Sequence, residues 1–146
     1  MKTHNSVLDE IDRIVEWYRD LPDHINSDRK SINNLLKARR KLASNQIALS
    51  RMVADAKEER DAAVFCRKKA FSENVLEYRN EGDTVGESEH KANIDTSTHR
   101  QREKLAEREY EAVKLIYSSV NDILNALSGD IRLLQYEYEK TNYRNE

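Results

Sequence analysis

Hydrophobic side chains recur at helical spacing near the start of the chain. Val7, Ile11 and Ile14 stand three or four residues apart and form one apolar stripe. The stripe ends at Leu21-Pro22-Asp23, and proline stops a helix because it has no amide proton and clashes with the preceding turn. The pattern therefore predicts a short helix over residues 6–20.

The next segment, residues 23–81, contains neither glycine nor proline over 59 positions. Its apolar residues follow the 3/4 spacing of a coiled-coil seam, but polar residues interrupt that seam. The interruptions are Arg39, Gln46, Arg60 and Arg67. We expect one long basic helix over residues 27–79, about 75 Å in length at ~1.5 Å per residue, covered along its apolar side by other helices.

Residues 80–97 break the helical pattern. This stretch is acidic and contains Gly82 and Gly86, a composition typical of a mobile loop. After it, an apolar stripe with a period close to 3.6 residues predicts a C-terminal helix over residues 98–140, which passes through Gly129 without a change of phase. We therefore expect an acidic hinge at residues 80–97 between two long helices.

Together these elements predict an all-α fold: a single helical domain over residues 1–146, with a short N-terminal helix and a long antiparallel helical hairpin. One hairpin cannot bury stripes this wide, so a homo-oligomer is expected. The expected oligomer interface is the apolar stripe of the C-terminal helix. It comprises Ile116, Val120, Ile123, Leu127, Leu134 and Tyr138.

Composition narrows the possible function classes. Three glycines and one proline among 146 residues are too few for a many-stranded β fold or a glycine-rich phosphate loop. A single cysteine, Cys66, excludes an internal disulfide and a multi-thiolate zinc site. Because no catalytic motif or metal-ligand spacing is present, we expect no enzymatic activity, cofactor or metal. No apolar run reaches the length of a membrane span, so a cytoplasmic location without membrane association is expected.

Charge is unevenly distributed, although the formal net charge is only −2. Residues 29–71 carry 12 basic and 4 acidic side chains, and the segments on either side are acidic. Clustered cations bind the phosphates of nucleic acids by displacing counterions. The alternative is a solvated helix face neutralised by the acids of the same chain. The candidate phosphate-binding residues are Arg67, Lys68 and Lys69, followed by Lys37, Arg39, Arg40 and Lys41.

Two phenylalanines, Phe65 and Phe71, flank the cluster at residues 67–69. An aromatic ring beside a cation suits base stacking on a single strand. Core packing is the alternative, and we favour it more firmly for Phe65 than for Phe71, so Phe71 joins the candidate nucleic-acid-binding residues. Cys66 is expected to be a buried structural thiol.

The order of elements resembles the UvsY family of phage recombination mediators, small helical proteins with a basic helical region, an acidic glycine-containing loop and a long C-terminal helix. A motif associated with single-stranded DNA binding in that family has the form Leu-Lys-Ala-Arg leading into an aromatic. Leu36-Lys37-Ala38-Arg39 reproduces its first four letters, and Phe65-Cys66-Arg67-Lys68-Lys69-Ala70-Phe71 fits by its position relative to the hinge. Residues 117–127 are similar to the family's oligomerising terminal helix.

The resemblance implies a ring-like homo-oligomer that binds single-stranded DNA and helps a RecA-type recombinase displace the single-strand binding protein, in the host cytoplasm if the protein is phage-encoded. Two other functions fit the sequence. A small helical phage protein could inhibit a host defence nuclease by docking its acidic loop, residues 81–89, on a basic DNA channel. A structural coiled-coil scaffold would form oligomers without affinity for nucleic acid.

Overall fold

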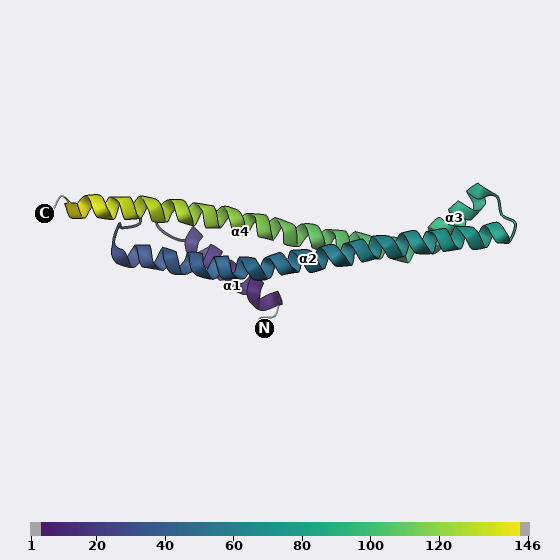
Figure 1. The fold of residues 1–146 in the computed structure, drawn as a ribbon, viewed down its shortest axis with the longest axis horizontal. Coiled ribbons are helices and arrows are strands. Elements are labelled where there is room, and N and C mark those ends of the chain that lie inside the picture. The colour runs from purple at the N-terminus through teal and green to yellow at the C-terminus, as the bar shows by residue number, and fades with distance from the viewer. Residues whose placement is uncertain (1–3, 144–146) are drawn as a thin grey trace. The chain divides into compact units, whose positions relative to one another are not determined.

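Four helices make up the structure, a computed structural model that describes residues 4–143 (Figure 1). They are α1 (His4–Arg19), α2 (Arg29–Asn80), α3 (Val85–Asp95) and α4 (Ser97–Tyr143). The two long helices, α2 and α4, pack antiparallel. This confirms the predicted all-α fold with a short N-terminal helix and a long helical hairpin, whereas the oligomeric state stays a prediction.

Contacts divide the described chain into two compact units. The α1 unit comprises residues 4–52 and 115–143, and the α3 unit comprises residues 53–114. Each unit takes one segment of α2 and one segment of α4, and is completed by the helix after which it is named here. The single helical domain stays a prediction.

The α1 unit has a core of large apolar side chains. Leu35, Leu42 and Leu49 of α2 are almost completely buried and stand seven residues apart, so they project from the same face of the helix. Each fully buried leucine stabilises the fold by roughly 1.5–3 kcal/mol. The other helices contribute Val7, Ile11 and Ile14 from α1, and Val120, Leu127, Ile131 and Leu134 from α4.

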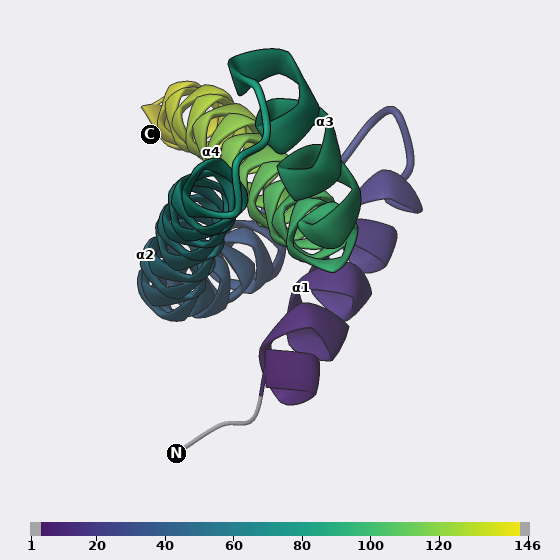
Figure 2. The same ribbon diagram turned by 90° about the vertical axis from the view of Figure 1, so that its right-hand side faces the viewer.

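Helix α1 lies beside α2 and α4 within the α1 unit (Figure 2). Its Tyr18 hydroxyl donates a hydrogen bond to Asp130 Oδ2 of α4 at 2.5 Å. Burial of the phenol, followed by this hydrogen bond, raises the pKa of Tyr18 to about 12. The contact joins the last turn of α1 to α4.

The α3 unit buries small side chains instead. Ala56 and Ala63 of α2 and Ala92 of α3 are buried, together with the hydroxyl residues Ser88 and Thr96. Both hydroxyls are satisfied within the chain, because the Ser88 hydroxyl donates to backbone carbonyls one turn earlier and Thr96 Oγ1 donates to the Ala92 carbonyl at 2.7 Å. Small buried residues contribute little hydrophobic stabilisation, so polar contacts contribute a larger share of the stability of this unit.

The polar residues that interrupt the predicted seam of α2 face α4. In the α1 unit, Arg39 Nε donates to Ser128 Oγ at 2.9 Å. Gln46 Nε2 donates to Asn121 Oδ1 at 3.3 Å. Gln46 stands seven residues after Arg39 on α2, and Asn121 stands seven residues before Ser128 on α4. This is the spacing that antiparallel heptad packing requires.

In the α3 unit the two remaining interruptions also contact α4. The Arg60 guanidinium lies 4.4 Å from the ring centre of Tyr110, and its Nε is 3.7 Å from Glu107 Oε2. The Arg67 guanidinium forms an ion pair with the Glu103 carboxylate. The charged residues in the seam are therefore cross-helix contacts, which explains why α2 tolerates them on its inner side.

The expected hinge at residues 80–97 is wrong as a loop, because most of it is helix α3. Helix α2 ends at Asn80, and Gly82, in the turn that follows, has a φ of 102°. The Gly82 amide donates to the Arg79 carbonyl at 3.2 Å, and the Asp83 amide donates to the Tyr78 carbonyl at 3.1 Å. This pair of bonds is the Schellman motif, which needs one residue in the left-handed backbone conformation. Glycine adopts that conformation readily.

Helix α3 follows from a capping box at Thr84. The Glu87 amide donates to Thr84 Oγ1 at 3.4 Å, and the Thr84 amide donates to Glu87 Oε2 at 3.0 Å. Hydrogen bonds from the Thr84 hydroxyl and amide lower the pKa of the Glu87 carboxyl. Lys91 Nζ reaches back to Asp83 Oδ2 at 2.6 Å. The Glu87 carboxylate thus accepts a hydrogen bond from the backbone at the start of α3, and Asp83 pairs with Lys91. These acidic residues support a helix here and not a loop.

The expected oligomer interface on α4 lies partly inside one chain. Val120, Leu127 and Leu134 are buried in the core of the α1 unit. The other three expected residues, Ile116, Ile123 and Tyr138, are half-buried. The stripe is wide because α1 packs against α2 and α4 in this unit. The three buried residues are therefore core residues of one chain and offer no surface to a second copy.

Candidate nucleic-acid interface

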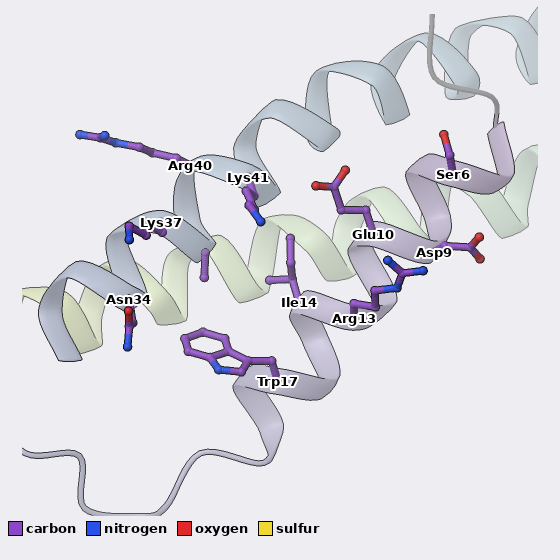
Figure 3. Close-up of a pocket in the computed structure, with 11 residues that line it drawn as sticks. Ser6, Asp9, Glu10, Arg13, Ile14, Trp17, Asn34, Lys37, Arg40 and Lys41 are labelled. Carbon is purple, nitrogen blue, oxygen red and sulfur yellow. The ribbon is translucent and has the colours of Figure 1, made fainter. Parts of the chain in front are cut away.

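A groove opens in the α1 unit between α1 and the N-terminal part of α2 (Figure 3). Its volume is about 860 Å³. The lining residues are Ser6, Asp9, Glu10, Arg13, Ile14 and Trp17 of α1, and Asn34, Lys37, Ala38, Arg40 and Lys41 of α2. We call it the basic groove.

The α2 side of the basic groove carries three of the predicted phosphate-binding residues, Lys37, Arg40 and Lys41. Arg40 and Lys41 stand three and four positions after Lys37, so all three share one side of the helix. All three side chains are exposed, and none of them forms an ion pair within residues 4–143. Their charges are therefore available to an anion.

Helix α2 begins at Arg29, two residues later than expected, because Asp28 caps it. The Asp28 carboxylate accepts a hydrogen bond from the Ser31 amide at 2.6 Å. This bond lowers the pKa of the Asp28 carboxyl. The cap fixes the start of the helix and with it the direction in which the basic side chains point.

The groove also contains one large aromatic residue, Trp17, which the sequence interpretation does not single out. Trp17 is the one tryptophan of the protein and is 38% exposed. Figure 3 shows its indole pointing into the groove, on the side of Asn34 and Lys37. Trp17 stands three residues after the buried Ile14, at the edge of the apolar stripe of α1. Its position at the edge of an apolar stripe is visible in the sequence, but its contact with the cations of α2 depends on the packing of α1 against α2.

Carboxylates from α1 reduce the positive charge of the groove without cancelling it. Asp9 and Glu10 line it together with Arg13. With the three cations of α2, the lining carries four cations and two carboxylates. In Figure 3, Asp9 and Arg13 lie on the α1 side, and Arg40 extends away from α1 toward solvent. The excess of cations lies on the α2 side of the groove.

The second basic cluster, residues 67–69, belongs to the α3 unit and is engaged differently. Arg67 is paired with Glu103 of α4, and Lys69 Nζ lies 3.9 Å from Glu73 Oε1 on the next turn of α2. Lys68 is exposed and forms no ion pair among the described residues. One alternative for the basic block is that acids of the same chain neutralise it. This applies to Arg67 and, at longer range, to Lys69.

None of the remaining candidates lines the basic groove. Arg39 donates to Ser128 of α4, and Phe71 is half-buried in the α3 unit. Phe65 and Cys66 are both exposed, so the expectation that they pack in the core is wrong. Both residues lie on the outer side of α2, which no other described helix covers.

No group of three or more His, Cys, Asp or Glu side chains within residues 4–143 could hold a metal ion. None of the described helices combines the length and apolar character needed to cross a bilayer. Comparisons with protein-family models, curated proteins and solved structures gave no match. Membership of the UvsY family therefore stays a prediction from layout and short motifs.

Proposed function

We propose that this protein binds single-stranded DNA in the basic groove and acts as a recombination mediator. The observation that carries the proposal is the meeting of Lys37, Arg40 and Lys41 with Trp17 in one groove. Cations alone fit any polyanion. The tryptophan adds a stacking surface that unpaired bases can use, so the combination favours a single strand.

Two physical effects support binding. Each phosphate neutralised by a lysine or arginine releases condensed counterions, which gives a slope of about −0.7 in log affinity against log salt for single strands. A base stacked on an aromatic side chain contributes roughly 1–3 kcal/mol. The bases of a duplex are already stacked on one another, so Trp17 should strengthen binding to single strands more than to duplexes.

The resemblance to the UvsY family extends the proposal to partners. The protein would act as a homo-oligomer and help a RecA-type recombinase replace the single-strand binding protein. Holding the strand in one conformation would lower the ordering cost of building the recombinase filament. This role requires DNA binding, so DNA binding is tested first.

Fluorescence anisotropy with a labelled oligothymidylate at rising NaCl concentration tests the proposal. The triple variant Lys37→Gln, Arg40→Gln, Lys41→Gln should bind more weakly, and the magnitude of its salt slope should fall by about 2. The matched control replaces three exposed lysines outside the groove by glutamine and should bind like the wild type. Those lysines are Lys57, Lys104 and Lys140. A wild type without affinity at low salt, or equal losses in both triple variants, would contradict the proposal.

Trp17 provides a second readout because it is the one tryptophan in the chain. Its fluorescence should be quenched when a base stacks on the indole, and a duplex of the same length should quench it less. The Trp17→Ala variant should lose about tenfold in affinity for the oligothymidylate, the lower part of the range for a single stacked base. Unchanged fluorescence at saturating oligonucleotide would remove Trp17 from the site.

The nuclease-inhibitor alternative has weaker support. Of the four carboxylates in residues 81–89, Asp83 is paired with Lys91 and Glu87 belongs to the capping box. Replacing the other two, Glu81 and Glu89, by glutamine should leave DNA binding unchanged. If the wild type binds no nucleic acid at all, the coiled-coil scaffold becomes the better interpretation.

A further inference from the structure

A second groove lies in the α3 unit, between α2 and α4, and the proposed DNA binding makes no use of it. Its volume is about 570 Å³. Four carboxylates line it, and Arg102 is the one cation among its described lining residues. The carboxylates belong to Asp55, Glu58, Glu59 and Glu109. We call it the acidic groove.

The carboxylates of the acidic groove are available to a ligand. All four side chains are exposed, and none of them forms an ion pair or hydrogen bond within residues 4–143. By contrast, Asp61 and Glu107 on the same two helices both contact Arg60. Like charges on neighbouring turns repel each other, and a cationic ligand would relieve that repulsion.

Apolar side chains also line the acidic groove, among them the buried Ala63. Ala62 and Ala106 line it with small side chains, and Leu105 is 64% exposed. Apolar side chains beside exposed carboxylates fit an amphipathic helix that carries an apolar anchor flanked by cations.

The same chain carries a surface of this chemistry on α2. Lys37, Arg40, Lys41 and Arg51 are exposed, and none of them forms an ion pair in the described part of the chain. At 3.6 residues per turn these positions fall within about a third of the helix circumference, together with Ile47, which is 63% exposed. We call this set of five residues the basic face.

We propose that the basic face of one copy docks in the acidic groove of a second copy. Exposed cations of the basic face would meet exposed carboxylates of the acidic groove, and Ile47 would pack on Leu105. Because the two surfaces are different patches of the chain, each copy can offer its basic face to one neighbour and its acidic groove to another, in a head-to-tail arrangement. The inference does not rest on DNA binding, although DNA would compete for Lys37, Arg40 and Lys41.

Sedimentation velocity of the full chain without nucleic acid tests the docking. The wild type should associate in about 20 mM NaCl and dissociate in about 500 mM NaCl, because salt at that level screens exposed charges within a few ångströms. The groove variant Glu58→Lys, Glu59→Lys and the face variant Lys41→Glu, Arg51→Glu should each sediment as monomers at both salt concentrations.

Mixing the two variants gives the decisive measurement. The face variant retains the acidic groove and the groove variant retains the basic face, so the mixture should associate at low salt although neither variant does alone. The control Glu77→Lys, Glu139→Lys makes the same change in net charge at exposed positions outside the groove and should associate like the wild type. A monomeric wild type at low salt, a groove variant that associates like the control, or a mixture that stays monomeric would each overturn the proposal. Because no DNA is present, none of these results depends on the anisotropy measurement.

Discussion

The Arg67 guanidinium of α2 forms an ion pair with the Glu103 carboxylate of α4, and less than a third of either side chain is exposed. The sequence places Arg67 at the centre of a basic cluster, but the pairing gives it a structural role in the α3 unit. Removing the arginine would leave Glu103 partly buried without a partner, which is the costly way to break an ion pair.

The Arg67→Gln variant should therefore lose stability rather than DNA affinity. We expect its free energy of unfolding to fall by about 1 kcal/mol, the upper part of the range for an ion pair that is still partly hydrated. Denaturant unfolding followed by circular dichroism measures this change. The control is Lys68→Gln, the exposed neighbour, which should leave stability unchanged. If Arg67→Gln instead lowered the salt slope of DNA binding as much as the basic-groove triple variant, residues 67–69 would belong to the DNA site.

Periodicity locates the long helices closely. The sequence predicts helices at 27–79 and 98–140, and α2 and α4 span Arg29–Asn80 and Ser97–Tyr143. Local propensity and the apolar stripe agree over these segments. The sequence also marks Arg39 as an interruption of the seam, but its partner Ser128 lies on another helix, and no local pattern specifies the register between them.

Composition misleads where a short signal opposes it. Acidic residues and two glycines suggest a loop at residues 80–97, yet Thr84-Val85-Gly86-Glu87 has capping-box spacing and starts a helix. The candidate site shows the same limit. The charge pattern identifies Lys37 and Lys41, whereas Trp17 joins them only because α1 packs against α2 in three dimensions.

Replacing each of two glycines by alanine should change the stability of the protein in opposite directions. Gly129 lies inside α4 with open space where a Cβ would stand, so Gly129→Ala should raise the free energy of unfolding by about 1 kcal/mol and the Tm by about 3 °C. Gly82 has a φ of 102°, which an alanine adopts with strain, so Gly82→Ala should lower the Tm. Thermal unfolding followed by circular dichroism measures both. Shifts of the same sign would show that one of these two backbone assignments is wrong.

Two tyrosines should resist ionisation at alkaline pH. Burial and the bond to Asp130 raise the pKa of Tyr18 to about 12, and the hydrogen bond to Asp95 raises that of Tyr78 to about 12. Both values lie above the 10.0 of a free phenol. The protonated phenols therefore favour the folded state below pH 10, and their contribution is lost as the pH rises toward 12.

An alkaline titration followed by tyrosinate absorbance tests this expectation. In the wild type two phenols should ionise late, and Tyr18→Phe and Tyr78→Phe should each remove one of them. The double variant should also lose less stability between pH 10 and pH 12 than the wild type. An unchanged late phase in both single variants would assign it to other tyrosines.

The buried polar residue of the α1 unit is Asn45, which is 2% exposed and whose Nδ2 has no hydrogen-bond partner among the described residues. It stands between the buried Leu42 and Leu49 at the 3/4 spacing of the seam, so it occupies a core position. An unsatisfied buried amide costs about 1–3 kcal/mol. Asn45→Leu keeps the number and branching of the side-chain heavy atoms and removes the unsatisfied amide, so it should raise the free energy of unfolding by about 1 kcal/mol.

Asn45→Ala separates desolvation from packing, because it removes the same amide but leaves a cavity. Removing the unsatisfied amide stabilises the alanine variant, but the cavity loses packing contacts. Asn45→Ala should therefore be less stable than Asn45→Leu. Denaturant unfolding of the three proteins gives the order. A leucine variant less stable than the wild type would mean that the amide is bonded after all, and that this polar core position stabilises the packing of the α1 unit instead of weakening it.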